Sequence, residues 1–288
     1  MIYVQLTGGL GNQMYGYSIG YALAKEYGDR LTIDLSAYPH SPRPFVLDRF
    51  AISANVESIS PAKLDSKIPR MFARMGRIIK TWKYGPCKWM KEDIELSRNK
   101  YYPYDFSYKK SLYLEGYFQN YRYFDKYKKE LSKELGPKEG SISEECKKLM
   151  EECRSNKESV ALHIRRGDYA AEWCIGDDYY NEAISCVTDR LGDVKFYIFC
   201  EDKECAAEYM NRLPGATYVT GNYNLDDIEE FFVMSACNHH ITANSSYSFW
   251  AAYLANSENQ IVTAPVYLHW GRDYYPEEWI AIDIKRNT

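Results

Sequence analysis

Short apolar segments alternate with longer amphipathic segments along much of the chain, which predicts an α/β protein. Residues 1–6 form an apolar run, residues 14–27 have helical spacing, and residues 31–36 form a second apolar run. This order at short spacing predicts a strand–helix–strand unit with parallel strands. Residues 39 to about 140 show no such order and are rich in Tyr, Lys and Arg, so we expect an irregular stretch there.

The alternation returns near residue 160. Helices are expected between the first two strands of this half, around residues 225–236, and over residues 246–255. The pattern predicts a second parallel sheet covered by helices on both faces. We therefore predict two α/β domains, 1–150 and 151–288, with the boundary inside a turn-rich and charged stretch at 140–158. The expected strands are residues 159–164, 195–200, 216–220, 239–243 and 260–264, the last being the final clear strand.

The composition is that of a folded soluble protein, with 45% hydrophobic and 26% charged residues. A net charge of −4 argues against a general nucleic-acid binder. No stretch offers the ~18 apolar residues that span a bilayer, and the start lacks the basic and apolar regions of a secretory signal. The eight cysteines include no CxxC pair, which favours reduced thiols over a zinc site or a disulfide framework. We therefore expect a cytoplasmic protein.

The stretch HIRRGDY carries the most distinctive polar residues, at the end of the predicted strand 159–164. Ligands of parallel sheets bind at the carboxyl ends of strands, where His163, Arg165 and Arg166 are expected to lie. Two adjacent arginines that leave a buried strand need an anionic partner, and their planar forks suit phosphate. The alternative is a salt bridge from Arg165 or Arg166 to Asp168 that fixes the turn.

Two further strand ends carry polar residues. Glu201 and Asp202 follow the strand at 195–200, where carboxylates accept hydrogen bonds from ribose or guanine, although Asp202 is equally suited to cap the next helix. Asn244, Ser245 and Ser246 join a strand to a helix, whose free N–H groups would hold a pyrophosphate, with plain serine capping as the alternative. Three phosphate-binding features on one rim predict a bound nucleoside diphosphate.

The opening stretch TGGLGNQM places glycines between the first strand and the first helix. It fails the GxGxxG dinucleotide pattern because Met14 stands at the position of the last glycine, which counts against an NAD-dependent oxidoreductase. The chain also has no GxxxxGK[ST] phosphate loop and no Asp-x-Asp pair of the kind that clamps manganese in metal-dependent sugar-nucleotide transferases.

Four stretches together resemble one family. GGLGNQMYGYSIGYALA, LEGYFQNYRYF, HIRRGDY and MSACNHHITANSSYSFWAAYLA are similar to the bacterial and animal α-1,2-fucosyltransferases of glycosyltransferase family 11, in the expected order across nearly the whole chain. The resemblance implies the GT-B fold, with two facing Rossmann-like domains: the first on the acceptor side, the second binding GDP-β-L-fucose. It also implies an inverting transfer that gives an α-fucoside, usually at the 2-hydroxyl of a β-galactoside, with no essential metal and no cofactor.

The resemblance also implies roles for individual residues. Arg165 is expected to neutralise the donor diphosphate, because the matched motif uses its first arginine there, with Arg166 and the helix start at Ser245 and Ser246 assisting. The sequence itself places Asp168 near the expected phosphate site, where it is expected either to accept the proton of the acceptor hydroxyl or to orient an arginine. The expected catalytic residues are Arg165 and Asp168, and the expected donor-binding residues are Gly9, Gly11, Asn12, Gln13, His163, Arg165, Arg166, Glu201, Asp202, Asn244, Ser245 and Ser246.

In this context the opening glycines are expected to let the backbone of the first domain approach the reacting centre. Asn12 and Gln13 would then offer amide hydrogen bonds to the donor phosphate or the fucose. A tight strand-to-helix turn with no further role is the simpler alternative. Two other hypotheses keep the fold: a different acceptor linkage, and a carbohydrate- or nucleotide-binding protein without turnover.

Residues 67–91 carry eight basic residues and no acidic residue. On a helical wheel, Met71, Met75 and Trp82 share one face and the arginines lie largely opposite. This pattern is typical of contact with an anionic membrane surface, which would suit a lipid-linked glycan acceptor and a location at the inner face of the membrane. The alternative is an ordinary amphipathic helix that packs on the core.

Overall fold

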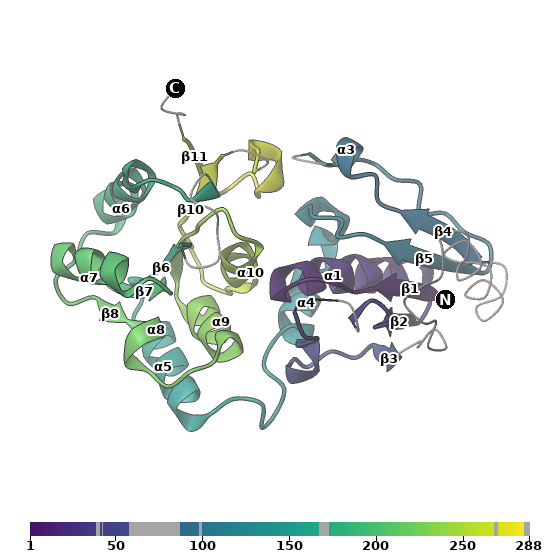
Figure 1. Cartoon of the computed structure of the whole chain (residues 1–288), viewed down its shortest axis with the longest axis horizontal. Coiled ribbons are helices and arrows are strands. Elements are labelled where there is room, and N and C mark those ends of the chain that lie inside the picture. Colours follow the sequence, from purple (N-terminus) through teal and green to yellow (C-terminus); the bar gives the residue numbers. More distant parts are fainter. Residues whose placement is uncertain are drawn as a thin grey trace, which may run out of the picture. The chain divides into compact units, whose positions relative to one another are not determined.

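The computed structural model describes residues 1–38, 41, 43–57, 87–97, 100–166, 173–267 and 270–284 of the 288-residue chain. The chain divides into two compact units. The first consists of Met1–Asp48 and Ile52–Lys128, and the second of Arg49–Ala51 and Lys129–Thr288. Among the described residues, each unit is built on one sheet (Figure 1), and the pairs between its strands are parallel.

The first unit has a five-stranded sheet in the order β3-β2-β1-β5-β4. The predicted strand–helix–strand unit is confirmed as β1 (Ile2–Gln5), α1 (Leu10–Tyr27) and β2 (Leu31–Asp34). The helix packs tightly on β1, because a Cβ on Gly16 would meet Leu6 at 2.6 Å and a Cβ on Gly20 would meet Val4 at 2.5 Å. Glycines at these two positions therefore bring α1 against the strand, which helps to bury the helix over most of its length.

The stretch from 39 to 140 is more regular than the sequence predicted. It supplies β3 (Asn55–Glu57), β4 (Cys87–Lys91) and β5 (Ser111–Glu115) to the first sheet, together with the short helix α3 (Ile94–Ser97). β3 and β4 lie at the two edges of this sheet as described, where a strand has fewer neighbours to pack against. They therefore lack the long apolar run that predicts a buried strand. Short helices follow as η3 (Tyr121–Tyr123), η4 (Asp125–Tyr127) and α4 (Lys128–Glu134), and η2 (Leu47–Arg49) precedes β3.

The basic segment 67–91 is described only at its end. Residues 87–91 form the strand β4, so the helical pattern does not extend to Lys88 and Lys91. Both lysines have local partners, since Lys88 Nζ lies 3.1 Å from Asp105 Oδ2 and Lys91 Nζ lies 3.1 Å from Glu115 Oε1. These two cations are therefore already engaged within the first unit. Residues 67–86, which carry the rest of the proposed membrane-binding face, lie outside the described residues.

The second unit has a six-stranded sheet in the order β11-β10-β9-β6-β7-β8. Two differences from the predicted pattern stand out. β8 is only two residues long before α8 begins, and a further strand, β11, follows the expected last one. The strands are β6 (Ser159–Ile164), β7 (Lys195–Cys200), β8 (Thr217–Tyr218), β9 (His239–Ile241), β10 (Val262–Val266) and β11 (Ile280–Asp283).

Helices cover both faces of this sheet, as predicted. Val160, Leu162 and Ile164 of β6 pack with residues of α6 and α7 in one hydrophobic cluster. On the other face, the Tyr197 hydroxyl of β7 donates to Glu152 of α5 at 2.8 Å, and α5 packs on α9. The helices are α5 (Glu144–Ser155), α6 (Asp177–Leu191), α7 (Lys203–Arg212), α8 (Val219–Asn222), α9 (Asp227–Ala236) and α10 (Ser246–Leu254), with the short η6 (Arg272–Tyr274) before β11.

The chain changes unit at Lys128, before the 140–158 stretch that the sequence indicated. The reason is tertiary: α5 begins at Glu144 and already packs on α9 of the second unit. The second unit also includes Arg49–Ala51 from the first half of the sequence. Phe50 packs on Phe231 and Phe232, with ring centroids 6.0 Å and 4.8 Å apart, so this short segment belongs to the core around α9.

Candidate active site

Three polar segments meet at the carboxyl edge of the second sheet. β6 pairs with β7 through Ile164 and Cys200, and with β9 through Leu162 and Ile241. The residues that follow these strand ends are therefore neighbours on one edge, as the sequence predicted. Those residues are Arg165 and Arg166 after β6, Glu201 and Asp202 after β7, and Thr242–Ser245 after β9.

His163 is buried at the end of β6. Burial lowers the pKa of its imidazole to about 3, and the charge of Arg165 acts in the same direction, so the ring is neutral near pH 7. Its Nδ1 atom has no hydrogen-bond partner among the described residues. The ring lies 5.6 Å from the ring of Tyr247 on α10. A buried polar atom without a partner is costly, so this nitrogen is well placed for a ligand.

The two arginines after β6 have different surroundings. Ile164 packs in the cluster beneath α6 and α7, and Arg166 follows it on the same side, with Nη2 3.3 Å from Asp177 Oδ1 at the start of α6. Asp177 also accepts a hydrogen bond from Tyr209 at 2.9 Å. Arg165 lies on the side of His163 and Tyr247, since its charge influences the pKa of both. Alternation along the extended chain explains the separation.

The structure does not test the predicted alternative of a salt bridge from Arg165 or Arg166 to Asp168, but it gives Arg166 another acidic partner. Arg166 pairs with Asp177, 11 residues further along the chain, and thereby ties the motif to the start of α6. Asp168 itself lies in the segment 167–172, outside the described residues. Its expected role as base or as arginine partner stays a prediction.

Two thiols contact the Arg166 side chain. Cys174 and Cys205 both hydrogen-bond to its guanidinium, which raises the pKa of Arg166 against the effect of burial. Cys205 lies in the first turn of α7. A hydrogen bond with Cys200 and the charge of Arg166 lower the pKa of the Cys205 thiol to about 7. This cysteine is therefore substantially ionised at neutral pH.

Asp202 and Ser245 both cap helices, which are the simpler roles considered for them. Asp202 Oδ1 accepts from the backbone N–H groups of Glu204 and Cys205, each at 3.0 Å, and so begins α7. Ser245 Oγ accepts from the Tyr247 N–H at 3.3 Å and begins α10, whose first residue is Ser246. A capping carboxylate has one oxygen left for a ligand.

Asn244 and Glu201 also lie at this edge. The Asn244 amide donates to the backbone oxygen of Trp173 at 2.8 Å, which ties the segment after β9 to the chain that follows the arginine motif. Trp173 is itself 44% exposed. Glu201 is exposed between β7 and the cap of α7, so its carboxylate is accessible from solvent.

Glu230 on α9 is a residue that sequence reasoning missed. Its Oε2 accepts from Thr220 at 2.8 Å, and Thr220 Oγ1 in turn accepts from the Cys200 N–H at 3.3 Å, at the end of β7. Burial raises the pKa of the Glu230 carboxyl to about 7, and the charges of Asp227 and Glu201 add to the shift. The sequence feature that could have identified Glu230 is the group of four acidic residues at 226–230. Helical spacing separates such side chains onto different sides of the helix, so one of them can lie near the end of β7.

In the first unit, the glycine loop follows β1. Gly8 has φ +80°, and a Cβ there would lie 2.8 Å from Asn12 Nδ2, so the turn requires glycine. Gly9 is the N-cap of α1 and makes no side-chain cap, and a Cβ there would meet no atom within 4 Å. The start of α1 is thus open at Gly9, while Gly11 is buried in its first turn. A helix start of this kind suits an anion.

The two amides of the loop differ in what they can do. Gln13 is buried, and its amide nitrogen donates to Gly8 O at 3.0 Å and to Pro44 O at 2.9 Å. Its Oε1 accepts from the Val46 N–H at 3.0 Å. Gln13 therefore braces the loop and has no N–H left for a donor phosphate, contrary to the expectation from sequence. Asn12 is half-buried, and its Oδ1 accepts from Gln119 at 2.7 Å.

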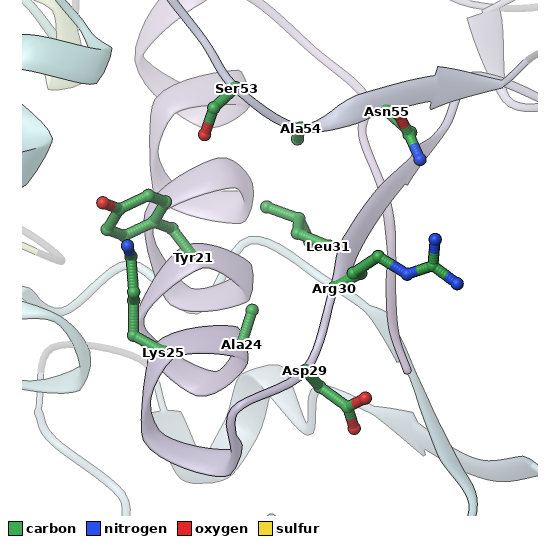
Figure 2. Close-up of a pocket in the computed structure, with 9 residues that line it drawn as sticks. All are labelled: Tyr21, Ala24, Lys25, Asp29, Arg30, Leu31, Ser53, Ala54 and Asn55. Carbon is green, nitrogen blue, oxygen red and sulfur yellow. The ribbon is translucent and has the colours of Figure 1, made fainter.

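A separate pocket of about 260 Å³ lies at the opposite end of the first sheet. Figure 2 shows Tyr21 and Lys25 of α1 on one side, Leu31 in the middle, and Arg30 and Asn55 on the other side, with the Arg30 guanidinium directed away from the helix. Leu31 and Asn55 are the first residues of β2 and β3, so this is the amino end of the strands. Its volume is below the ~300 Å³ of the smallest usual ligand pockets, and its cations do not converge.

Comparison with known proteins decides the family. The model of glycosyl transferase family 11 matches residues 1–283. The chain belongs to glycosyltransferase family 11. This family 11 protein is 30% identical to an α-1,2-colitosyltransferase of Escherichia coli over 98% of this chain and 99% of the relative. It is 28% identical to the O-antigen biosynthesis glycosyltransferase WbnK of Escherichia coli, over 92% and 93%, and 26% identical to the galactoside α-(1,2)-fucosyltransferase 2 of Rattus norvegicus, over 90% and 68%.

Solved structures show the fold of this family 11 protein. The NodZ α-1,6-fucosyltransferase soaked with GDP-fucose matches with a TM-score of 0.51 at 13% identity, covering 88% of this chain and 92% of that one. The GT-B fold, with two Rossmann-like α/β units on parallel sheets, is thereby confirmed. Within the part of the chain that the structure describes, no helix combines the length and apolar character needed to cross a membrane, and no three His, Cys, Asp or Glu side chains are grouped to hold a metal ion.

Proposed function

We propose that this family 11 glycosyltransferase transfers L-fucose from GDP-β-L-fucose to the 2-hydroxyl of a galactoside, with inversion, to give an α-1,2-fucoside. The observation that carries the proposal is the edge after β6, where the buried and unpartnered Nδ1 of neutral His163 lies beside Arg165. A neutral imidazole suits a nucleoside or sugar group, and an arginine fork suits the diphosphate. The relatives named as α-(1,2)-fucosyltransferases support the choice of sugar and linkage.

In this proposal the second unit holds the leaving group. The bond between C1 of fucose and the diphosphate oxygen breaks, the acceptor oxygen bonds to C1 from the opposite face, and the acceptor proton passes to a base. The charge that develops on GDP would meet Arg165 and the N–H groups at the start of α10, at Ser245 and Ser246. Arg166, anchored to Asp177, would support the same group from the other side of the strand. Asp168 is the proposed base.

The guanine ring has a suitable partner in Glu230. Guanine presents N–H donors on its Watson–Crick edge, and a half-buried carboxylate at the carboxyl end of β7 can accept them. Asp202 and Glu201 would complete the ribose side. The proposal requires no metal ion, because the arginines and helix N–H groups supply the positive charge, so enzyme treated with a chelator is expected to keep its turnover.

A second donor is favoured by a specific observation. The relative with 30% identity over 98% of this chain is named an α-1,2-colitosyltransferase. Colitose is L-fucose without the 3-hydroxyl, so the two sugars have nearly the same shape. The two donors would differ at a single hydrogen-bonding group, and a site built to bond a hydroxyl discriminates strongly against an analogue that lacks it.

The test is a donor and acceptor panel. GDP-L-fucose and GDP-linked colitose are supplied separately with β-galactosides, GDP release is measured, and the product linkage is read by NMR. An α-1,2-fucoside formed faster than its colitose counterpart supports the main proposal, and the reverse preference supports the second donor. Binding of GDP without any product from either donor would refute both and favour a non-catalytic binding protein.

A further inference from the structure

The loop that follows β5 has an unusual backbone. Gly116 has φ +149°, and Phe118, a bulky residue, has φ +50°. Positive φ at a non-glycine residue is uncommon and costs energy that surrounding contacts must offset. Phe118, directly after Tyr117, is such a residue, and Gly116, directly before it, has a φ that only glycine readily adopts, so contacts from the rest of the unit must hold the loop in this shape. Conformations of this kind persist where a particular side-chain position is needed.

Glu92 supplies the contacts that hold the loop. The side chain is buried, and its Oε2 accepts from the Tyr117 N–H at 2.7 Å and from the Phe118 N–H at 2.9 Å. Its Oε1 accepts from Ser97 Oγ at 2.8 Å. A Cβ on Gly116 would lie 2.3 Å from the Cβ of Glu92, so glycine is required for the close approach. One buried carboxylate thus satisfies two N–H groups of a loop that has no regular secondary structure.

Phe118 fixes the other side of the loop. Its side chain is fully buried and packs edge-on against the rings of Tyr104, Phe106 and Tyr123, with centroids 5.5, 6.1 and 6.1 Å away. With Phe118 held in this cluster and the backbone held by Glu92, Tyr117 has little freedom to move. The Tyr117 side chain remains half-buried, so part of it is accessible to a ligand.

Tyr117 lies against the glycine loop of the first unit. Its hydroxyl is 3.3 Å from the position of a Cβ on Gly8. Gln119, two residues on, donates to Asn12 at 2.7 Å, so the loop after β5 and the loop after β1 are joined by side chains. The hydroxyl of Tyr38 also lies here, 3.5 Å from Gly8 O. β1 and β5 are adjacent, so these groups share the carboxyl edge of the first sheet, where ligands of parallel sheets bind.

We propose that the Tyr117 hydroxyl hydrogen-bonds to the acceptor sugar, and that Glu92 is a positioning residue that sets Tyr117 in place. This inference rests on the proposed function. A phenol hydroxyl can both donate and accept a hydrogen bond, which suits a sugar hydroxyl. The Tyr117 side chain carries no positive charge and the carboxylate of Glu92 lies at its backbone N–H, so Tyr117 itself is matched to a neutral sugar, whereas the start of α1 at Gly9 would suit an anion. The ligand of Tyr117 is therefore the neutral acceptor rather than the phosphate end of the donor.

The experiment compares four variants with the wild type in two assays: transfer to a β-galactoside, and hydrolysis of GDP-fucose without acceptor. Tyr117→Phe removes only the hydroxyl, and Glu92→Gln weakens the hold on the loop. Each is expected to lower kcat/KM for the acceptor by roughly 10- to 100-fold, since small displacements of a positioning group have effects of this size. Donor hydrolysis is expected to stay at the wild-type rate in both variants.

The double variant and a matched control separate positioning from general damage. If Glu92 acts through Tyr117, the double variant Glu92→Gln/Tyr117→Phe transfers no more slowly than the slower single variant. Ser97→Ala removes a hydrogen bond to the other oxygen of Glu92 and leaves both loop contacts, so it should transfer at close to the wild-type rate.

Wild-type transfer by Tyr117→Phe would overturn the proposal, and so would defects of the two single variants that multiply in the double variant. If Glu92→Gln does not fold, Tyr117→Phe alone decides, because it leaves the backbone contacts intact. Absence of any transfer by the wild type is a different result, since it refutes the proposed function before any variant is compared.

Discussion

Replacement of Gly116 by alanine is expected to destabilise the first unit far more than the same change at Gly28, where an added Cβ would meet no atom. The added Cβ would lie 2.3 Å from the Cβ of Glu92 and 2.8 Å from its Oε2, distances that real Cβ atoms do not reach. The backbone at φ +149° also lies where side chains are rarely tolerated. The loop must shift away from Glu92, so the substitution tests whether its shape is as tightly determined as the contacts indicate.

The magnitude has two parts. Strain from the unfavourable φ costs about 1–3 kcal/mol, and forcing an extra methyl group into a filled space costs about 1–3 kcal/mol more. The total is roughly 2–6 kcal/mol, a large share of the stability of a small domain. Gly28→Ala is the matched control within the same unit: its φ is +65° and a Cβ there would meet no atom within 4 Å, so only the left-handed conformation is penalised, by about 1–2 kcal/mol.

Hydrogen exchange is the appropriate assay, because a chain of two units does not unfold in one transition and a single melting temperature would mix them. Exchange of the amides of β1 and β5 is followed as urea is raised, for the wild type and both variants. Gly116→Ala should lose clearly more protection in these strands than Gly28→Ala. Equal losses in the two variants would show that the space at Gly116 is not filled as the structure has it, and would refute the reasoning.

Four further predictions concern single residues. Arg165→Lys is expected to lower turnover about tenfold or more, because lysine lacks the bidentate fork, and near-wild-type kinetics would refute the assignment. The pKa of the Glu230 carboxyl is raised to about 7, so this group should ionise as the pH rises through that value, and calorimetry should show that GDP binds more tightly at higher pH. Glu230→Gln should lose this pH dependence. If the variant keeps it, Glu230 does not bind the guanine. The pKa of the Cys205 thiol is lowered to about 7, so iodoacetamide should alkylate this thiol first, at a rate that rises with pH around that value. Mass spectrometry should show that this early label is absent in Cys205→Ser. Burial lowers the pKa of His240 from 6.5 to about 4, so the unfolded state binds the proton more strongly and the second unit should lose stability as the pH falls below 6.5. Hydrogen exchange of the β9 amides measures this loss. An equally steep loss of stability in His240→Gln would contradict the prediction.

The sequence determined many of the parts of the fold that bury apolar surface, although it missed β5, an interior strand with Leu112, Tyr113 and Leu114 fully buried. β1, α1 and β2 at the start, and the alternating elements from β6 to β10, follow from hydrophobic runs and helical spacing. The same pattern placed the three polar segments after β6, β7 and β9, and parallel pairing then brought them to one edge. The candidate site was predictable to this extent because the residue types of a short segment are enough to indicate a buried strand and the polar loop that follows it.

The pattern failed at β5, a short strand within a stretch rich in Tyr, Lys and Arg, and it also failed where burial is incomplete or partners are distant. β3 and β4 lie at the edges of the sheet as described and contain no long apolar run. Arg49–Ala51 joins the second unit through Phe50, which packs on residues some 180 positions away. No local signal marks either feature, because an edge strand needs only one neighbour and a single buried ring carries no periodicity. The boundary between the units also differs from the expected one, because it depends on contacts between distant elements such as α5 and α9.

What the sequence alone determined is therefore the identity and order of the chemical groups: the two arginines, the histidine before them, and the glycines after β1. Only the tertiary structure decided which of these groups already have protein partners. Both N–H groups of the Gln13 amide are bonded to backbone oxygens, Arg166 is paired with Asp177, and Glu92 holds the loop after β5. Hydrogen bonds between residues far apart in the chain depend on where the folded backbone places each donor and acceptor, and a one-dimensional pattern does not contain that information.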